Sequence, residues 1–135
     1  MRTSLLVTSS LLLASLVACG DDGASTSVDA APPVDATPST VAVVTCPATP
    51  DAEVTAPGFS YTISRASLPV GAIVRFVMPA LHDANSGMVV GGIGTPDQKF
   101  HVDFGQTACL RFDAPGTYPF YCAPHLFTGS LTITP

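Results

Sequence analysis

The sequence contains no tryptophan, only three histidines and only five basic residues among its 135 positions. Nucleic-acid binding needs a clustered basic surface, so the shortage of lysine and arginine argues against that function. The net charge of −5 is modest, and many of the acidic residues precede position 41, which leaves too little charge beyond it for strong electrostatic steering of partners. No run of a dozen residues has the 3.6-residue apolar spacing of a helix, so a helical domain is excluded.

The N-terminal segment has the layout of a secretory signal peptide. Residues 1–18 contain one arginine, then an uncharged apolar run and then small residues, and the run is too short for a spanning helix. The letters LVAC at positions 16–19, followed by glycine, resemble the bacterial lipobox, in which Cys19 becomes the lipid-modified first residue. The alternative is an ordinary signal peptide with an unmodified cysteine. We predict an exported chain, anchored to a bacterial membrane through lipid alone, with its domain in the periplasm or at the cell surface.

Residues 19–40 predict a tether rather than a folded unit. They are rich in aspartate, proline, serine and threonine and contain neither aromatic nor basic residues. Such a segment buries too little apolar area to offset the entropy lost on ordering, so we expect it to be disordered. A disordered tether would let the folded domain extend away from the membrane. The folded domain is therefore predicted over residues 41–135.

Short runs with a period of two dominate the predicted domain. Turn residues separate these runs, which is the pattern of β-strands. The fold class is predicted to be all-β, and about 95 residues with such frequent turns suit a two-sheet sandwich. The predicted strands lie at 41–45, 59–64, 72–78, 107–113, 117–122 and 130–134.

The alternation also predicts which side chains face the core. In the strand at 107–113, Leu110 and Phe112 are expected on the core side and Cys109 on the opposite side. In the next strand Cys122 ends on the interior face. Pro119 faces the other way, which favours an edge strand or a bulge.

One short motif predicts metal binding. Cys122 and His125 are three residues apart, at a strand end and in a loop fixed by Pro124. A third ligand is needed, and His82 is favoured because it follows a strongly apolar strand and a turn, whereas His101 lies among polar residues where solvent exposure is expected. One thiolate and two imidazoles are the trigonal set of a blue-copper centre.

From residue 71 to 134 the sequence resembles the plastocyanin, amicyanin and pseudoazurin group of cupredoxins. The resemblance lies in GAIVRFVMPALHD, in FDAPGTYPFYCAPH and in the final GSLTIT. It implies a Greek-key β-sandwich in which His82, Cys122 and His125 hold one type 1 copper ion. It further implies a protein that carries single electrons between redox partners and is not an enzyme.

Two departures from the family pattern concern the copper site. Asp83 stands where the family usually has asparagine, so the hydrogen bond that braces the ligand loop is expected to differ. The axial methionine is missing: the amicyanin loop length places Thr128 there, and counting back from the following glycine places Phe127. Met78 and Met88 lie outside this loop and are expected to fill the core. The hypothesis is a three-coordinate or weakly capped copper with a raised reduction potential.

The cysteines divide consistently with this resemblance. Cys19 is assigned to lipid and Cys122 to metal, so Cys46 and Cys109 remain. In an exported chain such a leftover pair is expected to form a disulfide.

The main alternatives are a copper carrier or store and a cupredoxin-like interaction module without metal. A thiolate–histidine enzyme is disfavoured because no oxyanion-binding turn is evident, and structural zinc because it prefers four ligands. Three histidines are too few for a multicopper oxidase.

For electron transfer, an apolar rim is expected to dock a redox partner through a small interface. Leu126 and Phe127 form this rim near His125, and Leu81 forms it near His82. The protein itself is expected to be monomeric.

Overall fold

The computed structural model describes residues 39–135, so the predicted signal peptide, the predicted lipidation site Cys19 and nearly all of the tether lie outside the described residues. Within the described part no helix is long and apolar enough to cross a membrane. The described chain forms ten strands: β1 Val41–Val44, β2 Ala52–Gly58, β3 Ser60–Ile63, β4 Ser67–Pro69, β5 Ile73–Val77, β6 Ala84–Val90, β7 Ile93–Val102, β8 Thr107–Phe112, β9 Gly116–Tyr121 and β10 Thr128–Thr134.

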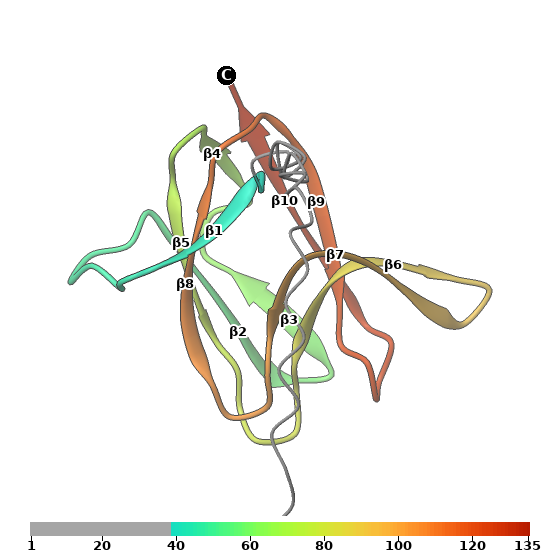
Figure 1. Ribbon diagram of the computed structural model, residues 1–135. Coiled ribbons are helices and arrows are strands. Elements are labelled where there is room, and N and C mark those ends of the chain that lie inside the picture. Colours follow the sequence, from blue (N-terminus) through green and yellow to red (C-terminus); the bar gives the residue numbers. More distant parts are fainter. Residues whose placement is uncertain (1–38) are drawn as a thin grey trace, which may run out of the picture. The chain divides into compact units, whose positions relative to one another are not determined.

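The strands form two five-stranded sheets (Figure 1). The first has the order β1-β8-β5-β2-β3 and the second the order β4-β10-β9-β6-β7. Pairing is antiparallel except between β2 and β5 and between β4 and β10. Neighbours such as β8 and β5, or β4 and β10, are distant in sequence, which is the crossover pattern of a Greek-key sandwich. The predicted all-β, two-sheet fold is confirmed.

The six predicted runs correspond to β1, β3, β5, β8, β9 and β10. Sequence periodicity missed β2, β4, β6 and β7. β6 and β7 contain glycine, proline and several polar residues, and most of their length forms a two-stranded hairpin that extends from the body of the domain (Figure 1). These strands are specified mainly by pairing with their neighbours, which a periodicity argument does not detect.

The core lies between the sheets and follows the predicted alternation. Leu110 and Phe112 of β8 and Phe120 of β9 have no exposed surface. In the same core cluster Phe76 of β5 packs edge-on against Phe120, and Phe100 of β7 contacts the rings of Phe76, Phe112 and Phe120. Burial of such side chains contributes about 1.5 to 3 kcal/mol each, so the core fixes the strand ends from which the site loops emerge.

β9 lies between β10 and β6, so the strand as a whole is not an edge strand, but Pro119 itself is paired only with β10, as at an edge. Pairing of β9 with β6 includes only Tyr121 and Phe120. Pro119 lies one residue beyond this short ladder, where no N–H is needed for pairing with β6. The proline is therefore compatible with an interior strand because β6 diverges at this point into the β6–β7 hairpin.

Candidate metal centre

Three of the predicted site residues come together at one end of the sandwich. His82 lies in the β5–β6 loop, Cys122 directly follows β9, and His125 lies in the β9–β10 loop. Their ligand atoms all lie within 4.8 Å of one another. His82 is 6% exposed and Cys122 is fully buried, whereas His125 is exposed. The fourth candidate, His101, lies on β7 with an exposed side chain and outside this group.

The spacing of the donor atoms suits a transition-metal ion. The Cys122 Sγ lies 3.6 Å from Nδ1 of His82 and 3.5 Å from Nδ1 of His125. Metal–nitrogen bonds of about 2.0 to 2.1 Å and a metal–sulfur bond of about 2.3 Å, at angles of about 110 to 120°, place sulfur and nitrogen about 3.6 to 3.8 Å apart. Both sulfur–nitrogen distances therefore match those expected around one bound ion.

The ligand loop is a closed turn. The Leu126 N–H donates to the Cys122 carbonyl at 2.8 Å, and the Cys122 N–H donates to the Phe127 carbonyl at 3.0 Å. Leu126 has φ of 59°, a left-handed conformation that costs about 1 to 2 kcal/mol for a residue with a side chain. Tight closure of this turn brings the imidazole of His125 back onto the sulfur of Cys122.

A buried carboxylate braces the two ligand loops. Asp83 is 3% exposed, and its Oδ1 accepts a hydrogen bond of 2.8 Å from the N–H of Ala123, the residue after Cys122. Its Oδ2 accepts a bond of 2.8 Å from the side-chain amide of Asn85, and Nε2 of His101 lies 3.9 Å from the same oxygen. The carboxylate of Asp83 thus accepts hydrogen bonds between the two ligand loops, and it also places a negative charge beside the ligands.

A tyrosine completes this brace from the other sheet. The hydroxyl of Tyr61, on β3, donates to the backbone carbonyl of Asp83. Burial raises the pKa of Tyr61 far above its usual range, with smaller contributions from Cys122 and Asp83. The phenol therefore remains a neutral donor at all ordinary pH values.

Burial also governs the state of the thiol in the metal-free chain. It raises the pKa of Cys122, while hydrogen bonds from the backbone N–H groups of Asp83 and His125 act in the opposite direction. A buried thiol with a raised pKa is a poor nucleophile at neutral pH. The same N–H groups are placed to stabilise the sulfur when it carries a negative charge.

Aromatic rings enclose the imidazoles. The ring of Phe127 lies 5.1 Å from that of His82, edge-on, and 6.3 Å from that of His125, nearly parallel. Tyr61 packs against the other side of this cluster, 4.7 Å from Phe127. Phe59, between β2 and β3, is 5.9 Å from His82 and 5.0 Å from His125. Sequence analysis did not assign Phe59 to the site, because no local motif indicates this contact.

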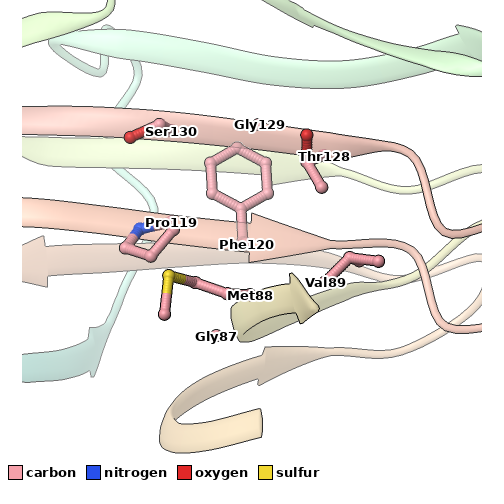
Figure 2. Close-up of a pocket in the computed structure, with 8 residues that line it drawn as sticks. All are labelled: Gly87, Met88, Val89, Pro119, Phe120, Thr128, Gly129 and Ser130. Atoms are coloured by element: carbon pink, nitrogen blue, oxygen red, sulfur yellow. The ribbon is translucent and has the colours of Figure 1, made fainter. Parts of the chain in front are cut away.

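The two candidates for the axial neighbour are in different places. Phe127 lies beside both imidazoles, whereas Thr128 lines a groove on the outer face of the second sheet together with Met88 (Figure 2). Strand alternation explains the difference, because a β-carbon built on the next residue, Gly129, would point at the interior ring of Phe120. Met78 is buried in the core, as expected, but Met88 is 56% exposed, so the expectation that it fills the core is wrong.

The remaining cysteines form the expected disulfide. Cys46 and Cys109 are joined by an S–S bond of 2.08 Å with a Cα–Cα distance of 5.1 Å. As predicted, Cys109 does not share the face of Leu110 and Phe112, and it is nevertheless only 1% exposed. Cys122 is the free cysteine among the described residues, so its sulfur is available for metal.

Comparisons with known proteins agree with this architecture at the level of fold. No protein-family model matches the chain, and no curated protein matches its sequence. Among solved structures, amicyanin from Paracoccus versutus (Thiobacillus versutus) superposes with a TM-score of 0.50 and 17% identity, over 70% of this chain and 98% of amicyanin. The chain has a cupredoxin fold. A reduced Cu(I) form of an amicyanin variant gives a TM-score of 0.49 and 19% identity, over 70% of this chain and 99% of that one.

The cupredoxin fold accounts for how the site is assembled. Strands of both sheets end near one another, and the loops between β5 and β6 and between β9 and β10 supply the three donor side chains. At 17% identity the likeness defines the fold alone, so the chemistry of the site has to be argued from its own residues.

Proposed function

We propose that this protein is a type 1 copper protein that carries single electrons between redox partners at a membrane surface. The observation that supports it most strongly is the group of one buried thiol and two imidazoles whose Nδ1 atoms lie 3.6 and 3.5 Å from its sulfur. Such a donor set is typical of blue-copper centres. Bound copper would supply a reversible one-electron couple between Cu(II) and Cu(I).

The protein residues would keep the donor positions constant as the charge changes. Cys122 is fixed by backbone hydrogen bonds, and Asp83 holds the loop beside it. His82 is buried between the rings of Phe59 and Phe127. Because these constraints exist before any metal arrives, little reorganisation would accompany electron transfer.

The axial environment supports a raised reduction potential. Phe127 lies beside both imidazoles and would offer no donor atom to a bound ion. A weak axial field favours the softer Cu(I) state, whereas the carboxylate of Asp83 opposes this effect. We expect the potential to exceed that of methionine-ligated members, and potentiometric titration of the copper-loaded chain would measure it. A lower value would refute the axial argument.

The exposed edge of the site suits a transient protein partner. His125 is exposed, and its neighbour Leu126 and the neighbour of His82, Leu81, have exposed fractions of 37% and 72%. Electron-transfer complexes bury small, weakly held interfaces that allow rapid exchange. We propose that the redox partner docks over His125 and that lipid on Cys19 keeps the domain near membrane-bound partners.

The alternative of a thiol enzyme finds less support in the geometry. Cys122 has no exposed surface, and burial raises the pKa of its thiol. A nucleophile must be reached by its substrate and must be ionised at the working pH. Metal binding does not need an ionised thiol in the free chain, because an ion displaces the thiol proton when it binds.

Loading the full chain with copper tests the proposal. An intense absorption near about 600 nm, bleached reversibly by a reductant, is expected from thiolate bonded to Cu(II) in such a centre. Cys122→Ser should abolish the band, whereas His101→Gln, at a histidine outside the site, should retain it. Tight copper binding without colour would favour a carrier or store, and a chain that binds no copper would refute the proposal.

A further inference from the structure

Phe59 occupies an unusual place for a large apolar side chain. It is the tip residue between β2 and β3, and its side chain is 75% exposed. The pairing of these strands shifts register between Thr55 and Gly58. Such bulges bend a strand and redirect its side chains. The tip thereby lies beside the two loops that carry His82 and His125.

The exposed ring has specific contacts with the site. Its plane is nearly perpendicular to both imidazoles, at 77° to His82 and 76° to His125. Edge-on aromatic pairs of this kind are attractive beyond the area that they bury. Phe59 lies outside the hydrophobic core cluster, and its aromatic contacts are with the two site histidines.

The accessibility of the site fits a covering role for this ring. His125 is exposed, yet Cys122, whose sulfur contacts the imidazoles of both His82 and His125, has no exposed surface. Phe59 packs on both of these imidazoles from outside the ligand loops. The ring of Phe59 thus lies against the two imidazoles that flank the sulfur of Cys122.

We propose that Phe59 is a shielding and positioning residue of the metal centre: its ring covers the two imidazoles, excludes small molecules from Cys122 and restrains His125. The shielding of Cys122 is a property of the metal-free chain. The restraint of a copper-bound His125 rests on the proposed function. The two parts are therefore tested separately.

The first experiment uses the metal-free full chain. Iodoacetamide is added under native conditions, and peptide mass spectrometry follows the alkylation of Cys122 separately from that of Cys19. Phe59→Ala should accelerate alkylation of Cys122 about tenfold, because a buried thiol reacts only as fast as it becomes accessible. Phe104→Ala, the same change at an exposed phenylalanine in the turn between β7 and β8, should leave the rate at the wild-type value.

The second experiment uses the copper-loaded chain. Azide is titrated while the optical and spin-resonance spectra are recorded, and copper release to a chelator is timed. Phe59→Ala should show azide binding and copper release about tenfold faster than wild type, since a missing supporting contact costs about 10 to 100-fold in metal binding. Phe59→Tyr, which keeps the ring and its edge contacts, should restore wild-type behaviour in both experiments.

The outcomes separate the two hypotheses. Faster alkylation of Phe59→Ala in a chain that binds no copper would support the shield and refute the proposed function. Normal colour with equal alkylation and azide binding in Phe59→Ala and Phe104→Ala would refute the shield and leave the proposed function standing. If Phe59→Tyr failed to restore protection, the aromatic contact would be refuted. Equal thermal unfolding temperatures in all variants would exclude general loosening as the cause.

Discussion

Replacing Asp83 tests the brace between the ligand loops. In Asp83→Ala, the N–H of Ala123 and the amide of Asn85 each lose a 2.8 Å hydrogen bond to a carboxylate. A hydrogen bond to a charged group contributes about 1.5 to 3 kcal/mol. Asn85 is half-buried and regains water, so we expect a loss of about 3 kcal/mol in the free energy of unfolding. Loss of such a supporting contact should also weaken copper binding about 10 to 100-fold.

The conservative variant Asp83→Asn separates hydrogen bonding from charge. Its amide oxygen still accepts from the N–H of Ala123, and the amide of Asn85 can turn to present its oxygen. We expect a stability loss of about 1 kcal/mol, consistent with a bond between neutral groups. Removal of the negative charge favours Cu(I) over Cu(II), so the reduction potential should rise in Asp83→Asn.

The assays are urea denaturation of the metal-free chain, copper competition against a chelator and potentiometric titration. Asp97→Ala is the control, because Asp97 pairs with Lys99 at 2.6 Å on the surface and exposed ion pairs contribute about 0 to 1 kcal/mol. If Asp83→Ala matched Asp97→Ala in stability and copper affinity, the brace would have no energetic role. A potential that fell in Asp83→Asn would contradict the charge argument.

Three further predictions concern the framework and the docking surface. Replacing both Cys46 and Cys109 by serine opens a link with a sequence separation of 63 and should cost about 4 kcal/mol in urea denaturation; an unchanged midpoint would refute this. Leu126→Lys should slow electron exchange with the physiological partner in stopped-flow measurements and leave the optical spectrum unchanged, whereas unchanged rates would exclude this surface. Gly129→Ala places a β-carbon 2.5 Å from the ring of Phe120 and 3.0 Å from that of Tyr61, and this overpacking should lower stability by about 1 to 3 kcal/mol. Wild-type stability in Gly129→Ala would show that the rings move aside freely.

Local patterns predicted much of the fold and the three grouped site residues. Period-two runs identified six strands, and alternation within them placed Leu110 in the core and Cys122 at the inner end of β9. Cys122 and His125 lie close together in the folded chain because only a short loop separates them in sequence. The β6–β7 hairpin could not be predicted in this way, since its stability comes from pairing rather than from periodicity.

The groups around the ligands depended on contacts between distant segments. Phe59 reaches the imidazoles from a bulged hairpin of the first sheet, and Tyr61 reaches the backbone of Asp83 across 22 positions in sequence. Asp83 was noticed as a departure from a family pattern, but its bond to Ala123 spans 40 positions. No local motif encodes contacts of this range.

The sequence by itself determined the strand class, the inward face of Cys122 and the pairing of a thiol with an imidazole in one loop. These features follow from side-chain alternation and short-range spacing, which depend on the local sequence and not on contacts between distant segments. Only the tertiary structure decided that Phe127 and not Thr128 lies beside the imidazoles and that Phe59 contacts them, and it brought His82, which the sequence favoured over His101, next to Cys122 and His125. Those choices depend on which strand ends meet when two sheets pack, and packing of the whole core sets that geometry.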